Sequence, residues 1–89
     1  MQIEKTKGHH LAKNENDEIM GYITYKVRSE NTIEIDHTVV HDEYAGQGLA
    51  SKLVRSVADE ARKEGWKIIP TCSYADAWFQ KHEEEKDLL

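Results

Sequence analysis

The sequence predicts an α+β fold, with a mainly antiparallel sheet, one parallel strand-helix-strand crossover and two helices. This prediction is based on changes in the spacing of apolar residues along the chain. Apolar residues alternate along 19–27 and 33–40, which is typical of half-buried strands. From residue 49 they recur on one helical face, and a short apolar run at 66–70 and a second helical pattern at 74–82 follow. A helix between two strands at this spacing indicates the crossover.

Three strands are expected in the first half of the chain. A weak candidate lies at 9–13 and is followed by turn-forming residues at 14–17. The strand at 19–27 is the clearest, and after a turn at 28–31 the β-branched run within 33–40 continues the pattern. Because short polar connections join these strands, we expect them to pair as an antiparallel meander.

The strongest element is a helix that begins near Leu49 and ends at Gly65. Charged residues occupy one face, and the other face carries Leu49, Ala50, Leu53, Val54, Val57, Ala58 and Ala61. Gly65 follows the last turn of this pattern, and glycine at such a position commonly ends a helix. We therefore expect this helix to cover one face of the sheet.

A short strand, a second helix and a tail complete the chain. Pro70 cannot donate to a strand ladder, so it predicts the end of the strand at 66–70 or an open sheet edge. We expect a right-handed parallel crossover to join this strand to the one ending near Val40. The acidic tail at 83–89 is predicted to be solvated and frayed. Core and helix packing is the simplest role for three aromatic residues, Trp66, Trp78 and Phe79.

Composition limits both the size and the function of the protein. With 89 residues, 38% of them hydrophobic, and a mean hydropathy of −0.78, we expect one domain over 1–89 with a small core. The net charge of −5 argues against nucleic-acid binding by phosphate neutralisation. Cys72 is the single cysteine, no secretion signal is evident, and no apolar run is long enough for a bilayer, so we expect a cytoplasmic protein without a membrane partner.

The loop Gly46-Gln47-Gly48 precedes the long helix. Two glycines allow positive φ angles and bring backbone amides close to a ligand, and a helix N-terminus attracts anions such as a pyrophosphate. The alternative is a tight turn that binds nothing. The loop lacks the third glycine of a dinucleotide fingerprint and the Gly-Lys-Ser/Thr of a P-loop, which excludes both of those motifs.

Three motifs in order resemble those of a known family. They are His37-Thr38-Val39-Val40, then Ala45-Gly46-Gln47-Gly48-Leu49-Ala50, then Ile69-Pro70-Thr71-Cys72-Ser73-Tyr74-Ala75 with Trp78 and Lys81-His82. Together they look like the small stand-alone N-acetyltransferase-like proteins of the GNAT superfamily, and the resemblance runs from about Thr32 to His82. In that superfamily the loop begins with Gln or Arg, whose side chain helps to fix the loop. This chain has Ala45 at that position, a departure that affects the affinity for the cofactor and not its identity.

The resemblance implies a minimal acyl-CoA N-acyltransferase fold that binds acetyl-coenzyme A. The pyrophosphate would lie on the loop and first helical turn, at Gly46, Gln47, Gly48, Leu49 and Ala50. The pantetheine arm would pair with the backbone of Thr38, Val39 and Val40. Lys52 and Arg55 could meet the outer phosphates, although an ordinary exposed helix face is an equally good interpretation of both.

Candidate catalytic residues follow the strands that flank the crossover helix. Cys72 could accept the acetyl group if its thiol is partly ionised, and the resemblance adds weight to that role; the alternative is a small packing residue. His37 and His41 could each act as general base, although His37 could be structural and His41 a solvated loop residue. The pair His9-His10 lacks further ligands at suitable spacing, so no metal site is predicted.

These observations lead to one functional hypothesis and two alternatives. The hypothesis is transfer of acetyl from acetyl-coenzyme A to the amine of a small molecule or a protein, possibly through Cys72. One alternative is a module that binds acetyl-coenzyme A, with a regulatory role and no efficient transfer, because the short chain lacks the additional helices that build an acceptor pocket. A more distant alternative is a small interaction domain without a ligand. The sequence does not predict the oligomeric state.

Overall fold

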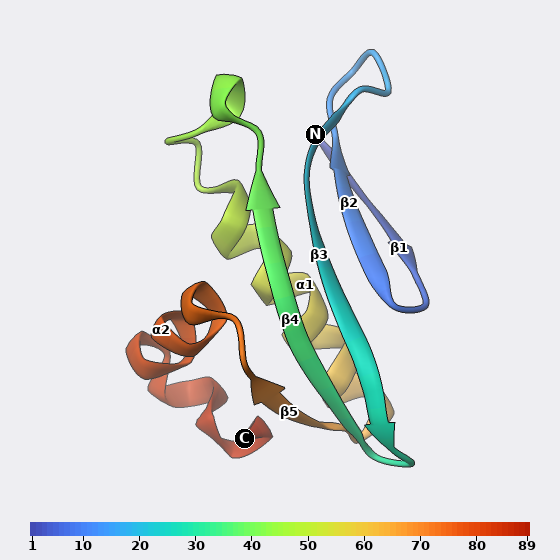
Figure 1. Cartoon of the computed structure of the whole chain (residues 1–89), viewed down its shortest axis with the longest axis vertical. Coiled ribbons are helices and arrows are strands. Elements are labelled where there is room, and N and C mark those ends of the chain that lie inside the picture. The colour runs from blue at the N-terminus through green and yellow to red at the C-terminus, as the bar shows by residue number, and fades with distance from the viewer.

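A computed structural model describes all 89 residues and contains one five-stranded sheet in the order β1-β2-β3-β4-β5 (Figure 1). The strands are β1 (Gln2–Thr6), β2 (His9–Lys13), β3 (Ile19–Ser29), β4 (Thr32–Val40) and β5 (Lys67–Pro70). The pairs from β1 to β4 are antiparallel, and β4 and β5 are parallel. The predicted α+β class and its single parallel crossover are confirmed.

Two α-helices and two short 3-10 helices connect and follow the strands. They are η1 (Asp42–Tyr44), α1 (Leu49–Glu64), α2 (Ser73–Lys81) and η2 (Glu83–Leu88). Gly48 precedes α1 and Gly65 ends it, both with left-handed backbone at φ +75° and +78°, a conformation that favours glycine. No helix combines the length and apolar character needed to cross a lipid bilayer.

One core joins α1 and α2 to the sheet. The apolar stripe of α1 is buried as predicted, except that Ala50 is only half-buried, and Leu53, Val54 and Val57 are fully inaccessible to solvent. In α2, Trp78 and Phe79 are buried in the same cluster, and Trp66 packs against it from the residue before β5. Trp78 also donates a hydrogen bond from Nε1 to the Ser51 hydroxyl, 2.9 Å away, which ties α2 to α1.

The first strand was not expected from the sequence. In β1 only Ile3 is apolar, and its neighbours are exposed, so the segment lacks the alternation that identifies a half-buried strand. Its backbone nevertheless pairs with β2 in register from Gln2 opposite Lys13 to Thr6 opposite His9. Backbone pairing of this kind needs little side-chain burial, so the alternation of apolar residues does not reveal this strand.

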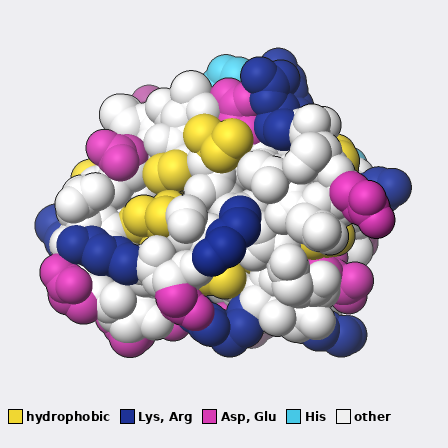
Figure 2. Space-filling view, turned by 90° about the horizontal axis from the view of Figure 1, so that it is seen from below, with side chains coloured by type: hydrophobic (Ala, Val, Ile, Leu, Met, Phe, Trp, Pro, Cys, Tyr) yellow, Lys and Arg dark blue, Asp and Glu magenta, His cyan; other side chains and the backbone are white.

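The acidic tail is exposed at Glu83, Glu84, Asp87 and Leu89, as predicted, but it is an ordered helix and not a frayed end. Residues 83–88 form η2, in which Leu88 is 5% exposed and Glu85 is 8% exposed. The Glu85 carboxylate forms ion pairs with Arg55 at 3.1 Å and with Arg62 at 3.0 Å, and both arginines lie on α1. The surface seen from below carries positive and negative side chains next to one another (Figure 2). The charge run is therefore part of the packing between η2 and α1.

The strand β4 extends beyond its neighbour β5. Pairing ends with Ile35 opposite Pro70, and the Ile35 carbonyl then accepts the amides of Thr71 and Cys72 at 3.1 and 3.0 Å before the chain enters α2. Residues 37–40 pair with β3 on one side, and no strand pairs with them on the β5 side (Figure 1). This half of β4 therefore has a free backbone edge, and the edge leads toward η1 and the glycine loop at 46–48.

Candidate functional site

The glycine loop leads directly into the first turn of α1. Gly46 has φ +83° and Gly48 has φ +75°, and no side chain caps the N-terminus of the helix. A Cβ built on either glycine meets no atom within 4 Å. The first-turn amides of α1 therefore carry the positive end of the helix dipole toward open space, an arrangement that suits a phosphate group.

The free edge of β4 suits a different part of the same ligand. Thr38, Val39 and Val40 pair with β3 through one edge, which leaves backbone donors and acceptors along the other. An extended chain that contains amide groups can pair with such an edge as an additional strand. The edge leads through η1 to the glycine loop, so one elongated ligand could contact both.

Cys72 lies at the start of α2 and faces β4. It is partly buried, and its sulfur lies 3.6 Å from the Thr38 hydroxyl oxygen. Burial alone would raise the pKa of the Cys72 thiol, but the Ala75 amide, the Thr38 hydroxyl and the Tyr74 amide favour the thiolate, so the net pKa lies below its ordinary value. The structure therefore places a partly buried thiol with a lowered pKa beside the free edge of β4.

The two candidate histidines lie apart from that thiol. His37 immediately precedes Thr38 in β4, so its side chain points to the opposite face of the sheet. There it is 69% exposed, with Nδ1 3.5 Å from an Asp36 carboxylate oxygen. His41 follows β4, donates its backbone amide to the Met20 carbonyl at 2.9 Å and is exposed. Neither histidine forms a pair with Cys72.

The two basic residues considered for the outer phosphates have different surroundings. Arg55 pairs with Glu85 at 3.1 Å, and its guanidinium lies 4.8 Å from the centroid of the Trp78 ring. Lys52 has no carboxylate within 4 Å and lines an open groove of about 420 Å³ between β1 and α1. Arg55 is thus engaged in packing, and Lys52 is the freer cation.

Some features near the site could not be found in the sequence. Tyr25 of β3 lies opposite Ile35 and Thr24 opposite His37, so Asp36 is an extra residue that forms a β-bulge in β4. The contact between Thr38 and Cys72 joins residues 34 positions apart in the chain. The structure groups no three His, Cys, Asp or Glu side chains that could hold a metal ion.

The comparison with known families decides the relationship. The profile of the GCN5-related N-acetyl-transferase family matches residues 9–88. The chain belongs to this family. A GCN5-like protein from Staphylococcus aureus, whose structure was solved by NMR, is 35% identical, with a TM-score of 0.78 over 98% of this chain and 85% of that chain.

Longer members of the acetyltransferase family share the same fold. One from Elizabethkingia anophelis, crystallised with acetyl-CoA, is 28% identical with a TM-score of 0.60, over 67% of this chain and 39% of that one. One from Escherichia coli, crystallised with CoA, is 24% identical with a TM-score of 0.60, over 67% of this chain and 37% of that one. The matched part of this chain therefore covers less than half the length of each of these two proteins.

Proposed function

We propose that the protein binds acetyl-coenzyme A and transfers its acetyl group to an amine. The observation that carries the proposal is the left-handed Gly48, which opens the uncapped N-terminus of α1 beside the free edge of β4. The amides of Gly46, Gln47, Gly48, Leu49 and Ala50 would hold the pyrophosphate, and the edge at Thr38, Val39 and Val40 would hold the pantetheine amides. Membership of the acetyltransferase family and the coenzyme A complexes of its longer relatives support this assignment.

Cys72 is the proposed nucleophile. Its thiolate attacks the acetyl carbonyl, which forms a sulfur–carbon bond and breaks the bond between the acetyl group and coenzyme A. The proton lost by Cys72 ends on the coenzyme A thiol. The amine of the acceptor then attacks acetyl-Cys72, which forms the carbon–nitrogen bond of the amide and breaks the sulfur–carbon bond, and one proton of the amine ends on the Cys72 sulfur. The lowered pKa of this thiol supports the first step.

Direct transfer is the alternative route to the same product. The amine attacks the thioester without a covalent enzyme intermediate, and a histidine takes its proton. His37 and His41 are the candidates, and their exposure leaves both accessible to an acceptor. Because His37 and Cys72 occupy opposite faces of β4, each route would bring the acceptor from a different side. A cytoplasmic site of action is part of the proposal, because Cys72 is a free thiol and reducing compartments keep thiols reduced.

A binding module without efficient transfer is the second candidate function. Ala45 favours it, since the related loops begin with a longer polar side chain. In this case acetyl-coenzyme A would bind and Cys72 would remain unmodified.

Two measurements separate these functions. Acetyl-coenzyme A at millimolar concentration should raise the melting temperature, because a ligand that binds the native state stabilises it; no shift with either acetyl-coenzyme A or coenzyme A would overturn the cofactor assignment. Mass spectrometry of the incubated protein should then find one acetyl group on Cys72, and Cys72→Ser should lose both the adduct and amine acetylation. Acetylation that persists in Cys72→Ser would favour direct transfer, and binding without any acetylation would favour the module.

A further inference from the structure

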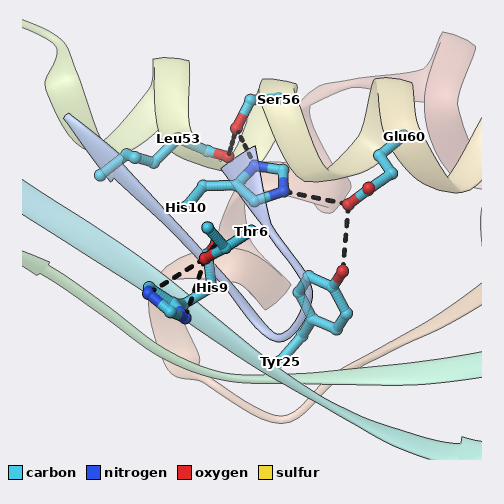
Figure 3. A network of polar contacts seen from close by, with 7 residues as sticks. All are labelled: Thr6, His9, His10, Tyr25, Leu53, Ser56 and Glu60. Carbon is cyan, nitrogen blue, oxygen red and sulfur yellow. Dashed lines mark hydrogen bonds and ion pairs between the residues drawn. The ribbon is translucent and has the colours of Figure 1, made fainter. Parts of the chain in front are cut away.

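A fully buried histidine joins α1 to the sheet at a distance from the proposed acetyl-transfer site. His10 lies on β2 and is 0% exposed. Its Nδ1 lies 2.8 Å from the Ser56 hydroxyl oxygen, and its Nε2 lies 3.0 Å from a carboxylate oxygen of Glu60. The Tyr25 hydroxyl donates to that same oxygen at 3.1 Å. Figure 3 shows the imidazole held between Ser56 and Glu60 on successive turns of α1.

The hydrogen atoms available to this network do not satisfy every contact at once when His10 is neutral. The Ser56 oxygen lies 2.7 Å from the Leu53 carbonyl as well as 2.8 Å from His10 Nδ1. Its single hydrogen can be donated to one of these acceptors at a time. The ionised Glu60 carboxylate only accepts, so it requires a hydrogen on His10 Nε2.

Two arrangements are therefore possible, one for each protonation state. With neutral His10, Nε2 donates to Glu60 and the Ser56 hydroxyl donates to Nδ1. With protonated His10, Nδ1 donates to the Ser56 oxygen, and the Ser56 hydroxyl rotates to donate to the Leu53 carbonyl. Both ring nitrogens have a partner in both arrangements, so neither state leaves a buried imidazole nitrogen without a hydrogen bond.

The surroundings of His10 allow protons to reach it. Although His10 is buried, the Glu60 side chain is 27% exposed and lines a surface groove with Lys5, Asp59, Lys63 and Glu64. Lys5 on β1 is directly opposite His10 in the strand register, and His9 precedes it on β2. The Tyr25 ring on β3 packs edge-on against the imidazole with ring centroids 6.1 Å apart.

We propose that His10, Ser56 and Glu60 form a proton-operated switch, in which protonation of His10 turns the Ser56 hydroxyl from the imidazole to the Leu53 carbonyl. The switch connects solution pH to the way in which α1 is attached to β2. The first turn of the same helix carries the proposed anion site. It does not depend on acetyl transfer and can be tested in the protein alone.

The charges around His10 set the direction of its response to pH. Burial lowers the pKa of His10, and the nearby positive charge of Lys5 lowers it further. Glu60 opposes them by its hydrogen bond and its charge, and the net pKa lies below the ordinary value. Since the unfolded chain takes up this proton more readily, the native state loses stability as the pH falls below about 6.5.

The experiment follows the imidazole by NMR between pH 4.5 and 8 in the folded protein. The two His10 ring nitrogens should be distinct at high pH and become alike on acidification. The carbonyl carbon of Leu53 should change with the same midpoint, since it gains the Ser56 hydroxyl. Ser56→Ala should abolish the Leu53 change and lower the midpoint, and Glu60→Gln should reduce the proton affinity of His10 by about tenfold.

Ser51→Ala is the matched control, because Ser51 lies on the same helix and its hydroxyl bonds Trp78 instead of His10. It should leave the His10 midpoint unchanged. Ring nitrogens that show no change across this pH range in the wild-type protein would overturn the switch. A Leu53 carbonyl signal that is unaffected when His10 titrates would overturn it as well, and this result does not depend on whether any variant folds.

Discussion

The Thr38 hydroxyl on β4 and the Cys72 thiol at the start of α2 lie 3.6 Å apart. The contact joins the free edge of β4 to the one cysteine of the chain. It also fixes the sulfur on the face of the sheet away from His37, since adjacent strand residues point to opposite faces. Thr38 therefore has two proposed roles, because its backbone lies along the proposed pantetheine edge and its side chain contacts the proposed nucleophile.

Thr38→Val should make the Cys72 thiol harder to ionise. Valine has nearly the shape of threonine but carries a methyl group in place of the hydroxyl. The Thr38 hydroxyl favours the thiolate of Cys72, so its loss should raise the pKa of that thiol. The pH midpoint of alkylation by iodoacetamide should therefore move upward. Thr38→Ser keeps the hydroxyl and should remain close to the wild-type midpoint. Equal midpoints for the valine variant and the wild-type protein would show that the contact does not tune the thiol.

Gly48→Ala should weaken the response to acetyl-coenzyme A more than it weakens the fold. Left-handed backbone costs a non-glycine residue about 1–2 kcal/mol, and the new Cβ would occupy open space in the loop that is proposed to hold the pyrophosphate. Gly65→Ala is a matched control at the other end of α1, where φ is +78° and a Cβ also meets nothing within 4 Å.

Thermal unfolding with and without acetyl-coenzyme A measures both effects. The two alanine variants should lose similar stability, and only the variant at Gly48 should lose the ligand-induced rise in melting temperature. A full rise in that variant would mean that the loop is a turn without a ligand.

Leu88→Ala should destabilise the protein by about 2–4 kcal/mol, as expected for a buried leucine. Leu88 is 5% exposed and belongs to the core, whereas the adjacent Leu89 is 43% exposed. Leu89→Ala should change stability by less than about 0.5 kcal/mol. Urea unfolding of both variants measures the difference. Equal effects would indicate that η2 does not pack against the core in solution.

Glu85→Gln should remove part of the acid sensitivity of the fold. Arg62 lowers the pKa of Glu85 against the effect of burial, and Arg55 lowers it further. This carboxylate therefore stabilises the native state above its unfolded pKa of about 4.3, and the contribution is lost as the pH falls through the lower native value.

The stability of the Glu85→Gln variant should accordingly fall less than that of the wild-type protein between about pH 5 and 3. Glu84→Gln alters the preceding, exposed residue and should follow the wild-type curve. Urea midpoints measured across this range make the comparison. Parallel curves for all three proteins would mean that the ion pairs of Glu85 add no stability.

The elements with strong patterns could be predicted, and those held by distant partners could not. Alternation along β3 and β4 and the apolar stripe of α1 arise from burial against one core, so they are visible in the sequence. Glu85 is buried because Arg55 and Arg62 lie next to it, and these partners are 30 and 23 positions away. A run of acidic residues carries no sign of such partners.

The same limit applies to the site. Glycines at 46 and 48 require unusual backbone angles, so the loop was recognisable from residue type. The contact of Thr38 with Cys72 and the burial of His10 depend on how β4, α1 and α2 are packed. His10 shares a face with Ala12, but two adjacent histidines in a polar segment do not indicate which one is buried.

The agreement between strand order and chain order has a consequence for folding kinetics. From β1 to β4 each strand pairs with the next along the chain, so each pairing closes only a short loop, and loops of this kind close quickly. β5 can pair with β4 only after α1 has crossed the sheet. We expect refolding to begin in the hairpins and to end with the docking of β5 and α2, so that Cys72 joins Thr38 in the last step.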